Sequence, residues 1–178
     1  LIVQLFGGGA QFEGALSKGQ QARVQQRAGA RGILTPRVAL ILEGEGELPE
    51  GFVSHCVEGE TLGRRIVTDP ALAEARARLP QQCAEVLARI HALDVAEFAD
   101  LPLRDAAMQL AELAAMHRGY GEALPVFEAA FARLHANQPR SVVPRLVHGD
   151  FRTGNLLVTA NGLSGVLDWE LSHRGDPM

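Results

Sequence analysis

The segment LVHGDFRTGNLLV, residues 146–158, places four polar side chains between two apolar stretches: His148, Asp150, Arg152 and Asn155. A plain buried strand does not tolerate such groups, because every buried polar group needs a hydrogen-bonding partner. Two interpretations remain open. The groups cap turns, as Asp and Asn often do, or they converge on one point and carry chemistry.

The spacing of the polar groups favours chemistry. Asp150 and Asn155 form the pattern H-x-D-x-x-x-x-N, and an Asn161-Gly162 turn, a strong hairpin signal, would fold Asp168 back toward them. Phosphoryl transfer needs such a set, since one carboxylate orients the attacking hydroxyl while a second carboxylate and an amide oxygen hold Mg²⁺. Magnesium prefers hard oxygen ligands, which Asp and Asn supply.

The rest of the chain predicts strands first and helices afterwards. From residue 70 onward apolar residues recur with a helical period, and Thr68-Asp69-Pro70 supplies a helix cap and a first-turn proline. Lys18 lies in ALSKGQQ, which is typical of a loop. We expect strands over 1–6, 37–43 and 51–57, helices over 20–32, 70–93, 108–116 and 126–134, and strands around the late hairpin. This order predicts an α+β fold with two lobes.

Composition narrows the classes of partner. The 178 residues include 17 Lys and Arg against 21 Asp and Glu, with a net charge of −4 and no long basic stripe, so we expect no nucleic-acid partner. The apolar start, LIVQLF, is too short for a membrane span or a signal segment. We therefore expect a cytoplasmic protein without membrane contact. The missing initiator Met and the abrupt end after HRGDPM predict a fragment or a concatenation of ordered pieces.

The combined motif LVHGDFRTGNLLV and GVLDWELSHRGDPM resembles the catalytic core of the aminoglycoside phosphotransferase and choline-kinase-like family, relatives of the protein kinases. GFVSHCVEGETLGRRIV is similar to the family's segment between the lobes, and the resemblance covers roughly residues 33–178. It implies a protein-kinase-like fold with a small, mostly β N-lobe over 1–53, which looks incomplete. The N-lobe is followed by a linker over 54–60 and by a mainly helical C-lobe over 61–178. This C-lobe would carry the catalytic hairpin and would be truncated at its C-terminus.

The resemblance also implies roles for single residues. Asp150 would be the catalytic base, Asn155 and Asp168 the Mg²⁺ ligands, and His148 an organiser of the loop. The family's linker contacts adenine through backbone groups, which here belong to Ser54, His55, Cys56 and Val57.

Supporting positions keep more than one interpretation. Arg152 contacts a phosphate or the acceptor, or it orders the loop through a salt bridge. Glu170 approaches the metal or, as we favour, has a turn or cap role. The glycine run after the first strand either cradles phosphates through backbone N–H groups or is a flexible turn; it comprises Gly7, Gly8 and Gly9.

The N-terminal part departs from the family pattern. Family members carry a strand with Lys or Arg, followed by a helix whose Glu pairs with that basic residue. Here no such strand is recognised, and Gln21 stands at the expected Glu position. Either a segment between about Gln11 and Leu16 is missing, or the phosphate-clamping pair has been lost. A Gln cannot neutralise a Lys, so the clamp would be weaker in any case.

We therefore expect a phosphotransferase that uses ATP and Mg²⁺ to transfer the γ-phosphate to a hydroxyl of a small-molecule substrate. The alternative is a catalytically impaired kinase-like module that binds a nucleotide or a partner. A two-metal phosphate hydrolase fits less well, because it normally needs more Asp or His ligands. The sequence does not define the acceptor, whose recognition we expect from the helical region over 104–140.

Overall fold

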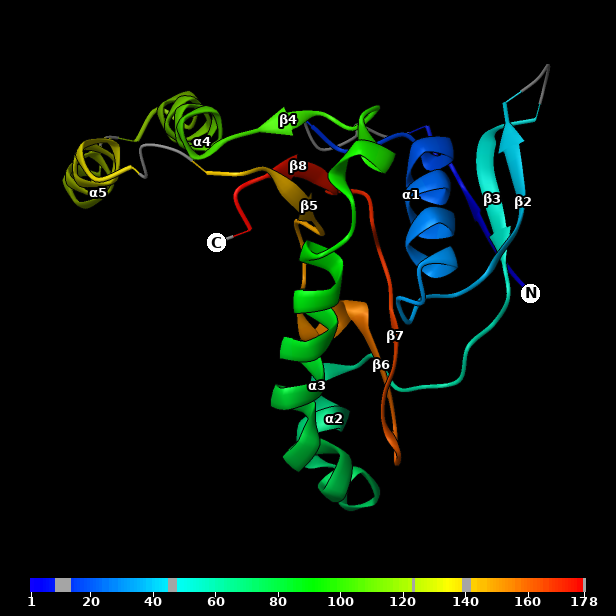
Figure 1. Ribbon diagram of the computed structural model, residues 1–178. Coiled ribbons are helices and arrows are strands. Elements are labelled where there is room, and N and C mark those ends of the chain that lie inside the picture. The colour runs from blue at the N-terminus through cyan, green and yellow to red at the C-terminus, as the bar shows by residue number, and fades with distance from the viewer. Residues whose placement is uncertain (9–13, 45–47, 123, 139–141, 178) are drawn as a thin grey trace.

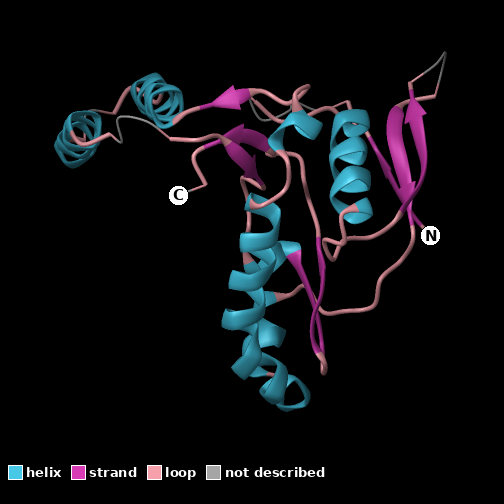
Figure 2. Ribbon diagram, viewed as in Figure 1, coloured by secondary structure: helices cyan, strands magenta, loops and turns pink. Residues whose placement is uncertain are grey.

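The computed structural model describes residues 1–8, 14–44, 48–122, 124–138 and 142–177 (Figure 1). Its elements, in chain order, are β1 (Ile2–Leu5), α1 (Lys18–Ala30), β2 (Val38–Glu43), β3 (Glu50–Ser54), α2 (Gly63–Thr68), α3 (Ala73–His91), β4 (Leu103–Arg104), α4 (Ala106–Gly119), α5 (Pro125–Ala136), β5 (Arg145–Val147), β6 (Leu156–Thr159), β7 (Gly162–Val166) and β8 (His173–Gly175). Within these residues the strands form three small sheets separated by helices, as Figure 2 shows. The predicted α+β class is confirmed.

The first sheet has the antiparallel order β1-β3-β2, and α1 packs on it. Phe52 at its centre is fully buried beside Ala22 of α1 and Val38 of β2. The strand predicted over 51–57 is too long, because β3 ends at Ser54. The chain leaves the sheet there and runs to the β6–β7 hairpin.

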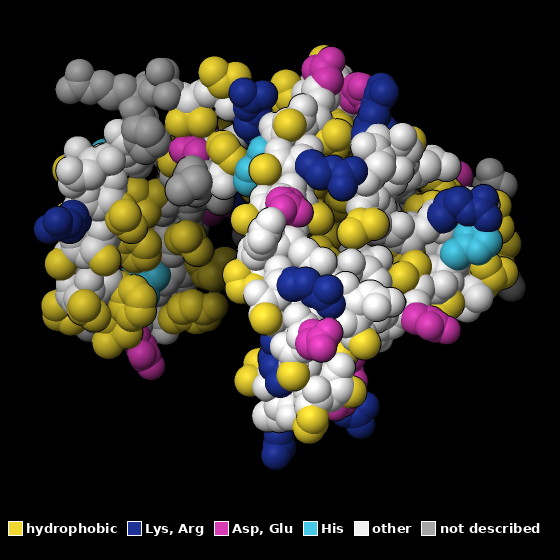
Figure 3. All heavy atoms as spheres, turned by 60° about the horizontal axis from the view of Figure 1, so that its bottom comes forward, with side chains coloured by type: hydrophobic (Ala, Val, Ile, Leu, Met, Phe, Trp, Pro, Cys, Tyr) yellow, Lys and Arg dark blue, Asp and Glu magenta, His cyan; other side chains and the backbone are white. Residues whose placement is uncertain are grey.

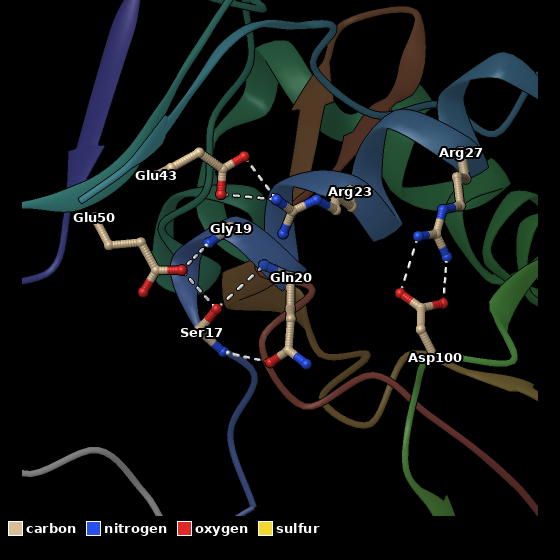
Figure 4. A network of polar contacts seen from close by, with 8 residues as sticks. All are labelled: Ser17, Gly19, Gln20, Arg23, Arg27, Glu43, Glu50 and Asp100. Atoms are coloured by element: carbon tan, nitrogen blue, oxygen red, sulfur yellow. Dashed lines mark hydrogen bonds and ion pairs between the residues drawn. The ribbon is translucent and has the colours of Figure 1, made fainter. Parts of the chain in front are cut away.

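Helix α1 begins at Lys18, so the loop predicted around this residue is wrong. Ser17 is the N-cap and forms a capping box with Gln20, in which each side chain accepts a hydrogen bond from the other residue's backbone N–H. This Ser-x-x-Gln pattern is the sequence signal that predicts the earlier start. A carboxylate from β3 reinforces the cap, since Oε1 of Glu50 accepts from Ser17 Oγ at 2.6 Å and from Gly19 N at 2.8 Å (Figure 4).

The outer face of α1 carries ion pairs to two neighbouring elements. Arg23 pairs with Glu43 of β2 at 2.6 Å, and Arg27 forms two hydrogen bonds to Asp100, which follows α3 in the chain (Figure 4). Exposed pairs of this kind contribute little free energy each. They connect α1 to the first sheet on one side and to the segment after α3 on the other.

The main core lies between α3 and the β6–β7 hairpin and extends under β5. Trp169, Ile90, Leu146 and Val166 are all fully buried there. The helix predicted over 70–93 starts instead with one 3₁₀ turn, capped by the side chain of Asp69, before α3 begins. This core forms the floor beneath the polar loop of residues 148–155.

Helices α4 and α5 project to one side of the molecule (Figure 1). Ala114 is the one buried residue among the described residues of α4, and those of α5 include none. Apolar side chains gather on this pair in Figure 3 and line a groove of about 770 Å³ between the two helices. Among the described residues, no helix is both long and apolar enough to cross a membrane.

Candidate active site

The polar loop is held in place by the pairing of two short strands. Strand β5 runs antiparallel to β8, which places the segment after Val147 against the segment before His173. Gly149 has φ +85°, and a Cβ at this position would overlap the carbonyl oxygen of Leu171. Only glycine fits so close an approach in this backbone conformation, so the fold requires the glycine of the HGD sequence.

Asp150 and Asn155 meet, as the spacing predicts. A 3₁₀ turn over Thr153–Asn155 brings the Asn155 side chain back, and its Nδ2 donates to Asp150 Oδ2 at 2.7 Å and to the Asp150 carbonyl at 2.9 Å. Arg152 Nε also donates to Oδ2, at 2.9 Å. Of the two interpretations of Arg152, the salt bridge is therefore the one observed. Both side chains bind the same oxygen, and none of the described residues donates a hydrogen bond to the second carboxylate oxygen, Oδ1.

Asp168 is brought to the same loop by the β6–β7 hairpin. The backbone N–H of the preceding residue, Leu167, donates to the carbonyl of Asn155 at 2.8 Å. Asp168 has φ +62°, the one positive φ at a non-glycine among the described residues. Such strained backbone clusters at functional sites, because the surrounding structure must compensate its cost.

His148 joins the two segments beneath the site. Its side chain is buried, its Nδ1 accepts from the backbone N–H of Asp150 at 3.3 Å, and its Nε2 donates to the Leu167 carbonyl at 2.9 Å. The ring also lies 4.8 Å from that of Trp169. Burial lowers the pKa of His148 from 6.5 to about 4. The neutral ring therefore bridges the backbone groups of Asp150 and Leu167, as expected for a structural histidine.

The segment after Asp168 docks on the N-terminal half of the chain. The carbonyl of Glu170 accepts from the backbone N–H of Leu16 at 2.7 Å, and Trp169 Nε1 donates to Thr35 Oγ1 at 3.1 Å. The Glu170 side chain lies 3.6 Å from the ammonium of Lys18. The predicted loop around Lys18 gave this side chain no partner, and because the two residues lie about 150 positions apart, no local sequence pattern indicates the contact.

The predicted linker runs from β3 to the hairpin. His55 N donates to the Arg37 carbonyl at 2.9 Å, Cys56 is exposed, and Glu60 pairs with Val158 of β6 through two backbone hydrogen bonds. The stretch from Ser54 to Val57 thus passes between the first sheet and the hairpin that carries Asp168. Its backbone groups stay our candidates for nucleotide contact.

The glycine run lies apart from the loop contacts described above. Gly7 and Gly8 are exposed after β1, and a Cβ at either would meet no atom within 4 Å; Gly9 is outside the described residues. No close approach therefore requires glycine at the two described positions.

Strand β1 lies where the family pattern has the strand with a basic residue before the helix, which here is α1. It pairs with β3 along its length and places Gln4 opposite Phe52, with no basic residue among its four positions. Gln21 on α1 is buried, with 1% of its surface exposed. Strand β1 thus fills the position beside β3, and residues 11–13, at the start of the segment considered for a missing piece, lie outside the described residues.

A cavity of about 550 Å³ opens beside the polar loop of residues 148–155, where Figure 3 shows a hollow between the α4–α5 pair and the rest of the molecule. Gly149 and Leu171 form one wall, and an ion pair between Arg104 and Glu112 contributes charge to a lining that also contains Met116. The cavity adjoins Asp150 through Gly149 and lies in the helical region predicted to recognise the acceptor. Its size suits a small polar molecule.

A comparison of the sequence with models of known protein families identifies a match. The family model described as the phosphotransferase enzyme family matches residues 2–178. The chain belongs to this family. No curated protein matches the sequence significantly.

Solved structures of phosphotransferases share the fold of this family member. A candidate aminoglycoside phosphotransferase from Ralstonia eutropha has a TM-score of 0.78 and 20% identity, over 98% of this chain and 63% of its own. The GDP and kanamycin complex of APH(2″)-IIIa has a TM-score of 0.68 and 20% identity, over 99% and 69%. APH(4)-Ia with AMP-PNP and hygromycin B has 0.61 and 21%, over 90% and 58%. The chain thus spans under two thirds of the Ralstonia protein, and the kinase-like fold is established.

Proposed function

We propose that this phosphotransferase-family chain transfers the γ-phosphate of ATP to a hydroxyl group of a small molecule, with Mg²⁺ as cofactor. The observation that carries the proposal is the hydrogen bond of 2.7 Å between Asn155 Nδ2 and Asp150 Oδ2, together with the backbone bond from Leu167 to Asn155. These two contacts bring together the Asp150 carboxylate, the Asn155 amide and Leu167, the residue before Asp168.

Asp150 is the catalytic residue of the proposal. Its Oδ2 is held by two donors, so the carboxylate is fixed in orientation while Oδ1 can accept the proton of the acceptor hydroxyl. Because the described loop is locked by His148 beneath it, the base does not have to reorganise during transfer.

The donor set fits a magnesium ion. Asn155 uses its amide nitrogen on Asp150, so its amide oxygen would be one ligand. Asp168 follows Leu167, whose backbone N–H donates to the Asn155 carbonyl, and its carboxylate would be the second ligand. Two protein oxygens suit a magnesium site completed by water and phosphate oxygens. Bound Mg²⁺ would supply neutralisation of the nucleotide's phosphate charge.

The acceptor would enter the cavity beside Gly149. Its wall combines the paired charges of Arg104 and Glu112 with apolar surface from Met116 and Leu171, which suits a polar molecule with an apolar ring face. Kanamycin and hygromycin B, present in two of the similar structures, belong to this chemical type. Aminoglycosides are therefore the first acceptors to assay, followed by macrolides, sugars and choline-like alcohols.

The experiment measures ATP consumption with Mg²⁺ across this acceptor panel. Asp150→Ala should lower turnover by about 10²–10⁴-fold, the usual contribution of a positioned acid or base, while MgATP binding is retained. Asp94→Asn is the matched control, because Asp94 caps an exposed 3₁₀ turn and Asn caps equally well. Equal turnover in Asp150→Ala and the parent would remove Asp150 from the mechanism.

A second candidate function is a nucleotide-binding module without transfer. Gln21 in place of an acidic partner, and Gln4 on a strand without a basic residue, favour it. Thermal stabilisation by MgATP, combined with no ATP consumption over the whole panel, would support this module. Acceptor-dependent consumption that Asp150→Ala abolishes would exclude it.

A further inference from the structure

Lys18 lies at the boundary between α1 and the segment that carries Asp168. Its Nζ donates to Gln21 Oε1 at 3.0 Å and lies 3.6 Å from Glu170 Oε2. The side chain is 20% exposed, and it is the only lysine among the 178 residues. The ammonium of the only lysine therefore lies beside Glu170, two residues after the proposed metal ligand Asp168.

The backbone at Lys18 is fixed from both sides. Ser17 and Gly19 each donate to the same carboxylate oxygen of Glu50 (Figure 4). The preceding residue, Leu16, donates its N–H to the carbonyl of Glu170. The position of the lysine relative to the Asp168 segment thus does not depend on a flexible loop.

The partner of Lys18 leaves its charge available. Gln21 is buried and neutral, so it orients the ammonium through a hydrogen bond without cancelling the positive charge. Glu170 is 37% exposed and at 3.6 Å, so it is a weak partner in water. An ammonium has three donors, and these two contacts account for two of them.

Four arginines of this region form direct hydrogen bonds to carboxylates. The three arginines of α1 and its C-cap each form hydrogen bonds to carboxylates on the outer face, namely Arg23 with Glu43, Arg27 with Asp100 and Arg31 with Glu97. Arg152 donates to Asp150. Of these five basic side chains, Lys18 is the one oriented by a neutral side-chain amide.

We propose that Lys18 binds the phosphates of the nucleotide from the first turn of α1, replacing a basic residue that strand β1 does not carry. The proposal rests on the proposed function, because it needs a nucleotide whose phosphates lie at Asn155 and Asp168. Lysine suits this role as a compact positive charge. Buried Gln21 is then the residue that positions this ammonium, which explains why a neutral side chain is tolerated there.

The single lysine permits a direct chemical test on the unaltered chain. An acyl phosphate of ATP transfers its acyl group to an amine beside the phosphates: the amine attacks the acyl carbon, the bond to the phosphate oxygen breaks, and the amine loses a proton to water. We expect a Lys18 adduct in the peptide ending at Arg23, suppressed by excess MgATP, with the α-amine as internal reference. No adduct at Lys18, or one that MgATP does not suppress, would overturn the inference.

Binding measurements separate a phosphate contact from a structural role. Lys18→Met should weaken MgATP binding about tenfold or more, the loss expected for one charge-assisted hydrogen bond, and change adenosine binding less than about twofold. Arg23→Met, on the same helix with an exposed partner, is the control expected to change neither. Unchanged MgATP affinity, or equal losses for MgATP and adenosine, would contradict the role of Lys18.

Failure of this inference differs from failure of the proposed function. If the parent does not bind MgATP, the function itself is refuted and Lys18 has no phosphate to contact. If the parent binds MgATP and Lys18→Met binds it equally well, only the role of Lys18 is refuted.

Discussion

Acidification should destabilise the folded chain through His148. Burial lowers the pKa of this residue from 6.5 to about 4 in the folded state, whereas the unfolded chain keeps an ordinary value. Between these two values the unfolded chain binds a proton that the folded chain does not, so lower pH favours unfolding. The stability that the neutral ring provides is present above about pH 6.5 and is lost as the pH falls toward 4.

The size of the destabilisation follows from the difference between the His148 pKa values in the unfolded and folded states. Each tenfold difference in proton affinity corresponds to about 1.4 kcal/mol, so the complete loss is about 3 kcal/mol and about 2 kcal/mol of it is reached by pH 5. His148→Gln removes the titrating group, and its amide can donate to the Leu167 carbonyl as Nε2 does. His91 and His173, whose pKa values burial also lowers, stay in both proteins and cancel in the comparison.

Urea denaturation at pH 7 and pH 5 measures this contribution. The difference in free energy of unfolding between the parent and His148→Gln should shrink by about 2 kcal/mol on acidification, because only the parent loses the histidine contribution. A difference that is the same at both pH values would refute the reasoning that the buried ring remains neutral.

Three further changes test how the site is supported. Gly149→Ala should cost more than about 2 kcal/mol in urea denaturation, because its φ is +85° and its Cβ would overlap the Leu171 carbonyl; a cost under about 0.5 kcal/mol would contradict this close approach. Glu50→Gln should cost about 1 kcal/mol, because it removes the negative charge at the start of α1, whereas Glu43→Gln in an exposed pair should cost under about 0.5 kcal/mol; equal costs would argue against the cap. Trp169→Phe should lower the free energy of unfolding by about 2 kcal/mol, because the fully buried side chain becomes smaller and loses its hydrogen bond to Thr35 Oγ1. Denaturation followed by circular dichroism measures this change, and an unchanged free energy of unfolding would contradict the packing.

The elements that local chemistry specifies were predictable from the sequence. The Asn161-Gly162 turn gave the β6–β7 hairpin, and Thr68-Asp69-Pro70 gave the start of the long helical segment. The spacing of Asp150 and Asn155 predicted their contact, because only a short turn separates them. In each case the signal lies within a few residues of the structure it specifies.

Features that depend on distant partners were not predictable. The Lys18 side chain meets Glu170 across about 150 residues of chain, and Glu50 caps α1 from β3, so neither contact has a local pattern. The end of β3 at Ser54 depends on where the chain must pair with β6. Only the start of α1 had an unused local signal, the capping box of Ser17 and Gln20.

A crystal structure with Mg²⁺ and AMP-PNP tests the central claim most directly. The account predicts a magnesium ion about 2.1 Å from the amide oxygen of Asn155 and from a carboxylate oxygen of Asp168, with the γ-phosphate facing Asp150. A nucleotide bound away from the β6–β7 hairpin, or a metal ion that contacts neither Asn155 nor Asp168, would contradict it.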